Sequence, residues 1–205
     1  MIESTIRPYN SQTRQEAAEV ITSGGVIAFR TDTFYGLGVD PLNVSAVRRL
    51  RELKGREESN PILLLISDET EVERFIEPSS LFRDVAARHW PGAITLVGSA
   101  KLNVPLELTA NTQTLGVRLP ADENLRELVR HCGGALTATS ANVSGQPPAR
   151  TAKEVSDYFP NDIDLIIDSG DATVTAPSTV LDVSGSKAKL IREGVVSREE
   201  LKNFL

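Results

Sequence analysis

Eight short apolar segments are the feature of this 205-residue chain that most restricts its fold. Each is rich in β-branched or other apolar residues and is bounded by turn residues, the pattern of a β-strand. They are residues 26–31, 61–67, 93–98, 114–120, 135–141, 164–170, 178–184 and 188–193. Helical segments separate some of them but not all, and Ser-Gly-Ser-Lys joins the last two as a hairpin turn would. We therefore predict an α/β (α+β-like) fold, with a twisted, mixed sheet of about seven strands flanked by helices.

Helices are predicted where a capping residue precedes apolar residues at helical spacing. Ser11 or Thr13 is expected to cap the first, and Asn43 is expected to cap the second, which ends at Gly55. Further helices are expected near residues 80–88, 124–132, 151–158 and 197–204. A chain of this length makes one domain, so we expect residues 1–205 to be a single domain. Its core is about residues 13–196, and residues 197–205 are a terminal helix.

Composition and charge narrow the class of protein. The single cysteine, Cys132, allows no intramolecular disulfide and fits a reducing cytosol. The N-terminus has no signal-peptide pattern, and no apolar run is as long as a membrane span. A cytoplasmic protein is therefore expected. The formal net charge of −6 argues against broad, nonspecific nucleic-acid binding.

Several familiar catalytic patterns are absent from the sequence. It contains no P-loop, no G-x-G-x-x-G after a strand and no G-x-S-x-G elbow. His89, His131 and Cys132 do not share the spacing of metal ligands, so no metal site is predicted. A catalyst built from this chain would work by positioning and charge stabilisation, without a covalent intermediate.

Basic and small polar residues suggest an anion site, although each has a structural alternative. Lys54 and Arg56 could clamp an anion, or they could simply favour the end of a helix. Ser140 and Asn142 follow a strand and could line a nucleotide or cap a turn. Arg118 alternates with apolar residues on a strand, where it could hold a carboxylate or be solvated.

The stretch Arg30–Pro41, RTDTFYGLGVDP, raises a different question. A strand there ends in two threonines, an aspartate, a tyrosine and two glycines. Small hydroxyl groups and glycines at such a point indicate that something lies against the backbone. Ser178 and Arg192, near the ends of the last two strands, are open to the same functional or structural interpretation.

Taken together, these motifs resemble one family. TDTFYGLGVDP, LKGRE with NPILLLI, WPGAITLV, GVRLP, TSANVSGQP, PSTVLD and IREG occur in its order and near its spacing. The chain is similar to the YrdC-like threonylcarbamoyl-adenylate synthases, in their short, single-domain form. The resemblance implies a YrdC-like fold with a concave active-site face. It also implies an enzyme that makes threonylcarbamoyl-AMP and pyrophosphate from L-threonine, bicarbonate or CO2, and ATP.

The resemblance further implies partners and roles for particular residues. ATP with Mg²⁺ is the expected nucleotide, and tRNA with threonylcarbamoyl-transferase proteins would act downstream. Lys54 and Arg56 would be catalytic. The ATP side would comprise Lys54, Arg56, Thr114, Ser140, Asn142 and Arg192, and the threonine side Thr31, Thr33, Tyr35, Arg118 and Ser178. Gly36 and Gly38 would allow close backbone approach, and residues 143–151 could form a flap over the site.

The chain also departs from the family pattern. Arg30 and Glu57 stand where proline is usual, and TATSAN replaces the commoner APSAN. One alternative is a YrdC-like RNA-binding or ribosome-maturation paralogue without synthase activity. A second is a carbamoyl-handling module of a maturation enzyme, but those modules usually have zinc-finger-like cysteines, and this chain has one cysteine.

Overall fold

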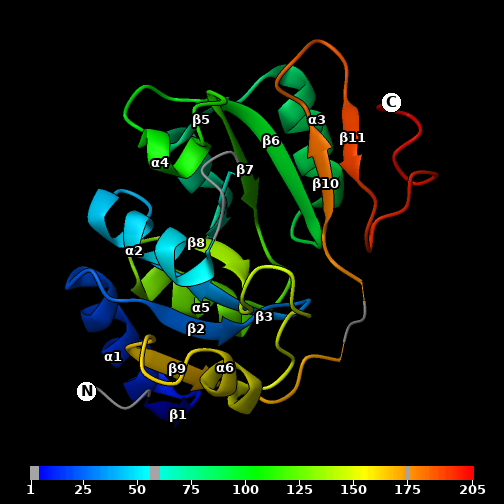
Figure 1. Cartoon of the computed structure of the whole chain (residues 1–205). Helices are drawn as coiled ribbons and strands as arrows, with labels where there is room; N and C mark the ends of the chain where they lie inside the picture. The colour runs from blue at the N-terminus through cyan, green and yellow to red at the C-terminus, as the bar shows by residue number, and fades with distance from the viewer. Residues whose placement is uncertain (1–4, 56–60, 174–175) are drawn as a thin grey trace.

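A central β-sheet organises the protein, which is described here by a computed structural model covering residues 5–55, 61–173 and 176–205 (Figure 1). The strands are β1 (Ile6–Pro8), β2 (Ile27–Arg30), β3 (Tyr35–Gly38), β4 (Leu63–Ile66), β5 (Ile76–Glu77), β6 (Ile94–Ala100), β7 (Thr114–Arg118), β8 (Ala135–Ser140), β9 (Leu165–Asp168), β10 (Thr179–Asp182) and β11 (Lys189–Arg192). The helices are α1 (Ser11–Thr22), α2 (Val44–Lys54), the 3-10 helix η1 (Glu69–Arg74), α3 (Ser80–His89), α4 (Leu106–Thr109), α5 (Glu123–His131) and α6 (Ala152–Tyr158).

The sheet is mixed and twisted, as predicted. Its strand order is β1-β9-β2-β3-β8-β4-β7-β6-β10-β11, with β5 paired to β6. β2 pairs antiparallel with β3 and parallel with β9, whereas β4 pairs parallel with β7 and antiparallel with β8. In Figure 1, β2 runs across the lower half while β6 and β10 run steeply through the upper half, which is the expected strand twist.

The expected number of strands, about seven, was too low, because the described residues contain eleven. All eight predicted segments contain a strand, and the last two form the predicted antiparallel hairpin β10–β11. The three additional strands are β1, β3 and β5. β1 and β5 are three and two residues long, and β3 has glycine at two of its four positions. Their pairing depends on neighbouring strands, so no local pattern marks them.

Residues 197–205 do not form the predicted terminal helix, which is the second correction. The segment is a series of turns. The Ser197 hydroxyl and the Glu200 carboxylate bond each other's backbone N–H, as at a helix start. The bonds that follow are mainly of the i to i+3 kind, such as Phe204 N to Leu201 O. Leu201 is fully buried and fixes the segment, while nine residues are too few for an independent helix.

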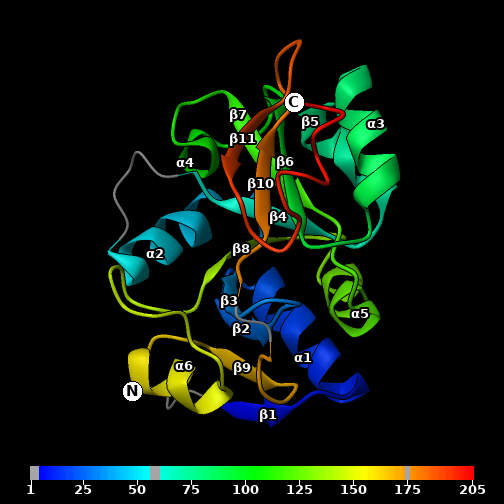
Figure 2. The same ribbon diagram turned by 90° about the vertical axis from the view of Figure 1, so that its right-hand side faces the viewer.

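Helices cover both faces of the sheet around β2. Ile27 and Phe29 of β2 pack with Leu125 of α5, whereas Ala28 packs with Leu50 of α2. Figure 2 shows α1 and α5 on one side of these strands, with α2 and α6 on the other. Within the described ranges, no helix combines the length and apolar character needed to cross a membrane.

Helix caps were partly predicted. Asn43 caps α2 by accepting from Ala46 N, and Gly55 ends the helix in the left-handed conformation, both as expected. The cap of α1 is Asn10, which accepts from Thr13 N. The prediction of Ser11 or Thr13 was therefore wrong by one to three positions.

Gly38 is the glycine of the threonine-rich stretch that close packing requires. A Cβ at this position would lie 2.7 Å from Phe29 Cε1 and 2.8 Å from the carbonyl oxygen of Thr137. The expectation of close approach is confirmed here. At Gly36, the nearest atoms would be at 3.4 Å, an ordinary contact.

We therefore expect Gly38→Ala to lower the free energy of unfolding by about 1–3 kcal/mol, since the strand carbonyl cannot move aside as a flexible side chain can. Gly36→Ala, in the same strand, is the matched control and should have a clearly smaller effect. Urea denaturation of both variants measures the difference. Equal stabilities would contradict this account of β3.

Candidate active site

A cavity of about 520 Å³ lies where the predicted motifs meet. Residues of the 31–36 stretch, β7, β8 and the β10–β11 hairpin all contribute to its wall. Eight predicted site residues line it: Thr31, Thr33, Tyr35, Thr114, Arg118, Ser140, Ser178 and Arg192. Residues far apart in the sequence therefore share one hollow of the sheet.

Thr31 organises a tight turn between β2 and β3. Its hydroxyl donates to Phe34 O at 2.7 Å, and it accepts from the backbone N–H of Thr33 and of Phe34 at 3.1 and 3.2 Å. The hydroxyls of Thr31 and Thr33 are 3.1 Å apart. The threonines in this stretch therefore build the cavity wall, which answers in part why a strand ends in small hydroxyl groups.

Tyr35 shapes the cavity in a way that its motif did not indicate. Its side chain is fully buried, and its hydroxyl donates to Gly170 O at 3.0 Å. Burial, and secondarily the nearby Asp168 carboxylate, raise the pKa of Tyr35 to about 12. Its backbone N–H donates to Ala149 O at 3.0 Å. Tyr35 thus joins β3 to two neighbouring segments, with its hydroxyl already engaged.

Arg118 is the buried cation of the cavity. The side chain lies at the end of β7 and is only 3% exposed as a residue. Its Nη2 forms an ion pair with Asp32 Oδ1 at 2.9 Å, while its Nε has no hydrogen-bond partner in the described part of the chain. Burial lowers the pKa of Arg118, Asp32 opposes that effect, and Arg192 adds to it. A guanidinium with an unused donor in a buried wall is suited to binding a carboxylate.

Asp32 is a residue that the sequence-based prediction missed. It stands between the two threonines of the turn, so the hydroxyl-rich stretch did mark its neighbourhood. No pattern along the chain relates position 32 to position 118. Only the pairing of strands brings the two side chains together.

Lys54 connects the two predicted anion motifs. Its Nζ donates to Ser140 O, to Ser140 Oγ at 3.3 Å and to Asn142 Oδ1 at 3.0 Å. Ser140 Oγ also donates to Asn142 Oδ1 at 2.5 Å. Among the described residues, Ser140 lines the cavity, and Lys54 and Asn142 reach it through Ser140. Lys54 is buried, so its ammonium group is held in one place.

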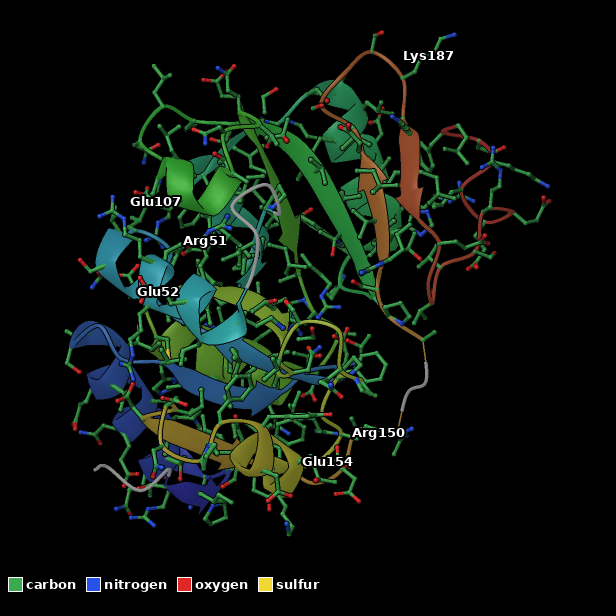
Figure 3. The ribbon with its side chains drawn as sticks, in the orientation of Figure 1. Arg51, Glu52, Glu107, Arg150, Glu154 and Lys187 are labelled. Carbon is green, nitrogen blue, oxygen red and sulfur yellow. The ribbon has the colours of Figure 1, made fainter. Side chains whose placement is uncertain are left out.

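The three arginines of α2 that precede Lys54 do not line the cavity. Arg48 pairs with Glu107 at 2.5 Å and Arg49 with Asp164 at 2.8 Å. Arg51 Nε donates to Glu107 O at 2.6 Å, and Figure 3 shows both residues where α2 faces α4. These three arginines hold α2 in the fold, which favours the structural interpretation for them. Arg56 and Glu57 lie outside the described residues.

Arg192, at the end of β11 in the β10–β11 hairpin, also lines the cavity. Its Nε and Nη2 donate to Ser178 O at 3.2 and 2.9 Å. Ser178 Oγ lies 3.4 Å from Thr95 Oγ1, another cavity residue that was not predicted. Burial lowers the pKa of Arg192. Thr114 also lines the cavity and shares a hydrogen bond of 2.9 Å with Thr112.

The segment 143–151 is tied to the anion motifs. Asn142 Nδ2 donates to Val143 O at 3.1 Å and to Gln146 O at 2.6 Å. The N–H of Ser144 donates to Lys54 O at 3.2 Å. Arg150 donates to Ala172 O, and Figure 3 shows it beside Glu154, whose carboxylate accepts from Arg150 N at 2.6 Å. A flap in this segment remains a prediction.

Three further residues fall outside the cavity. Arg30, which departs from the family pattern, pairs with Asp122 at 3.3 Å, away from the cavity lining. Burial raises the pKa of the Cys132 thiol to about 12, as expected for a buried apolar residue and not for a nucleophile. His131 Nδ1 lies 2.8 Å from Glu127 O within its own helix.

Comparison with known proteins identifies the family of this chain. A model of the Sua5/YciO/YrdC family, described as "Telomere recombination", matches residues 19–194. A threonylcarbamoyl-AMP synthase of Idiomarina loihiensis is 36% identical over 170 residues, which cover 82% of this chain and 91% of the relative. A protein of the same name from Pyrococcus abyssi is 35% identical over 190 residues, which cover 92% of this chain and 56% of the relative.

A solved structure extends the comparison. The P. abyssi protein Sua5 in complex with L-threonine superposes with a TM-score of 0.91 at 33% identity, covering all of this chain and 61% of that one. This chain therefore spans little more than half the length of the Pyrococcus protein. The fold, the cavity and these matches establish that the chain belongs to the Sua5/YciO/YrdC family.

Proposed function

We propose that the protein is an L-threonylcarbamoyladenylate synthase, a nucleotidyltransferase that uses L-threonine, bicarbonate or CO2, and ATP. The observation that carries this proposal is the meeting of two cationic sites at one cavity. Arg118 lines it with an unused Nε donor, and Lys54 reaches it through Ser140. One site suits an amino-acid carboxylate and the other suits phosphates.

The threonine side comprises Arg118, Thr31, Thr33, Tyr35 and Ser178. Arg118 binds the substrate carboxylate, because its guanidinium is buried and fixed. The other four residues give the pocket its shape. A relative from P. abyssi has been solved in complex with L-threonine, which supports an amino acid as the ligand.

The ATP side comprises Lys54, Arg56, Thr114, Ser140, Asn142 and Arg192. Lys54 and Arg56 act as the catalytic cations, with the role of Arg56 resting on the family motif. Lys54 reaches the cavity through Ser140 of β8, and Arg192 lines it from β11, so cations from two separate elements would border a triphosphate. Fixed positive charge in a partly dehydrated site stabilises a phosphoryl-type transition state far more than it would in water.

The chemistry proceeds in two steps. The threonine amine adds to CO2 and loses a proton, giving a carbamate. A carbamate oxygen then attacks the α-phosphorus of ATP, the bond to the β-phosphate oxygen breaks, and pyrophosphate leaves. Three anionic groups meet in these steps, and their mutual repulsion is strong when water is excluded. The chain's cations offset that repulsion, and a covering segment protects the labile carbamate from water.

Mg²⁺ accompanies ATP in this proposal. Mg²⁺ keeps several waters and is bound largely through substrate phosphates, so it needs few protein carboxylates. Asp182 is the carboxylate among the described cavity-lining residues, and no group of three potential ligands occurs in the described part of the chain. This arrangement fits an ion that arrives with the nucleotide and shields its phosphate charge.

The proposed setting is the cytoplasm, where tRNA and threonylcarbamoyl-transferase proteins use the product. Residues 1–205 would act as one domain with its core at about residues 13–196.

The function is tested by pyrophosphate release. Purified protein with ATP, Mg²⁺ and bicarbonate should release pyrophosphate and form an AMP adduct only when L-threonine is present. Omission of threonine and omission of bicarbonate are the controls. Threonine-independent turnover, or none, contradicts the proposal. Tight RNA binding with a steep salt dependence and no pyrophosphate would favour the RNA-binding paralogue instead.

A further inference from the structure

Asp32 is an unusually enclosed carboxylate. Both of its oxygens are sealed from solvent, and neither has a hydrogen-bond partner within the described ranges. Its one strong contact is the 2.9 Å ion pair with Arg118 Nη2. A carboxylate is costly to bury without compensation. The charge of Asp32 is therefore compensated mainly by Arg118.

The turn that carries Asp32 is built to be rigid. The Thr31 hydroxyl bonds the backbone at both Thr33 and Phe34, and Thr31 N donates to Phe34 O at 3.0 Å. The three residues that flank Asp32, namely Thr31, Thr33 and Phe34, are thus linked by one hydroxyl group. The Asp32 carboxylate is consequently held at a set place against the end of β7.

Arg118 needs such a fixed partner. Its guanidinium is buried close to Arg192, a second cation whose charge acts on it. A flexible arginine side chain beside a like charge would turn away or adopt several orientations. Arg118 lines the cavity while Nη2 forms the ion pair, and Nε has no hydrogen-bond partner among the described residues.

We propose that Asp32 is a positioning residue of the amino-acid site, fixing the Arg118 guanidinium in the orientation that receives the substrate carboxylate. This inference rests on the proposed function, because it takes L-threonine as the ligand. It assigns a role to the aspartate of the threonine-rich stretch. The two threonines form the turn, the turn places Asp32, and Asp32 places Arg118.

Calorimetric titration of L-threonine into Asp32→Asn tests the inference. The substitution keeps the shape but removes the charge that orients Arg118, so the Kd for threonine should rise about tenfold or more, as misplaced binding groups typically cause. The KM for ATP should change little. Asp122→Asn is the matched control: it removes the carboxylate opposite Arg30 at 3.3 Å but keeps a good helix cap. Its threonine Kd should equal that of the wild type.

A double mutant separates positioning from a general structural effect. If Asp32 acts through Arg118, adding Asp32→Asn to Arg118→Ala should raise the threonine Kd no further. Additive effects would overturn the inference. If Asp32→Asn fails to fold, Asp32→Glu moves the charge by one methylene, and the same rise in Kd is expected from it.

The other outcomes are equally decisive. An unchanged Kd in the Asp32 variant overturns the positioning role. A lower Kd overturns it as well, because it would mean that Asp32 only competes with the substrate for Arg118. Wild-type protein that does not bind threonine overturns the proposed function and this inference together, whereas a binding wild type with an indifferent Asp32 variant overturns this inference alone.

Discussion

Lys54→Ala is expected to lower kcat by two to three orders of magnitude, the usual cost of removing one fixed group that stabilises transition-state charge, about 3–4 kcal/mol. Its ammonium group contacts Ser140 Oγ and Asn142 Oδ1, and it is the cation that we place beside the phosphates. The threonine KM should change much less, because we assign the substrate carboxylate to Arg118. Steady-state pyrophosphate release over a range of threonine concentrations measures both quantities.

A loss of stability must be separated from this loss of turnover. Without Lys54, the oxygens of Ser140 and Asn142 lose a buried donor, which costs about 1–3 kcal/mol of folding free energy. Activity is therefore compared per mole of folded protein, determined by circular dichroism. Lys153→Ala is the control, because Lys153 is exposed on α6, where it pairs with Asp157 at 2.7 Å. A kcat near the wild-type value in Lys54→Ala would contradict the assigned role.

Arg118→Ala is expected to raise the threonine KM by roughly two orders of magnitude, since truncating one partner of a buried charge pair costs about 2–5 kcal/mol. At saturating threonine, kcat should be affected far less. The substitution also leaves the Asp32 carboxylate buried without its counter-ion. We therefore expect the free energy of unfolding to fall by about 3–5 kcal/mol.

Arg30→Ala provides the comparison for Arg118→Ala. Arg30 also forms an ion pair with an aspartate, Asp122, but it does not line the cavity. Its removal should leave the threonine KM within about twofold of wild type, because partly exposed ion pairs contribute less than about 1 kcal/mol. A similar rise in KM for both variants would show that the effect is not specific to the carboxylate site.

The predicted sheet and helices were largely confirmed because their signals are local. Leu63–Ile66 and Leu165–Asp168 are apolar runs between turn residues, and Asn43 caps a helix through its own side chain. The failures have a common reason. β3 contains two glycines and forms through its neighbours. Residues 197–205 have the start signal of a helix but too few residues to continue it.

The residues predicted for the site lie together in the structure, and their roles remain predictions. Thr114, Arg118, Ser140, Ser178 and Arg192 were chosen for their chemistry and their family motifs, and all five line one cavity. The contacts that these side chains make could not be predicted from the sequence. Nothing local distinguishes Arg51, which bonds Glu107 O, from Lys54, which bonds Ser140, although the two residues are three positions apart on α2.

By itself, the sequence determined the fold class, the family and the chemical groups available for binding, because these depend on local periodicity and on motif order. The tertiary structure alone decided which charged groups face one another. Asp32 and Arg118 are separated by 86 positions, and only the order of strands in the sheet brings them to 2.9 Å. Ion pairing depends on the distance between the charges in space and on the exclusion of water, and neither can be read from the sequence.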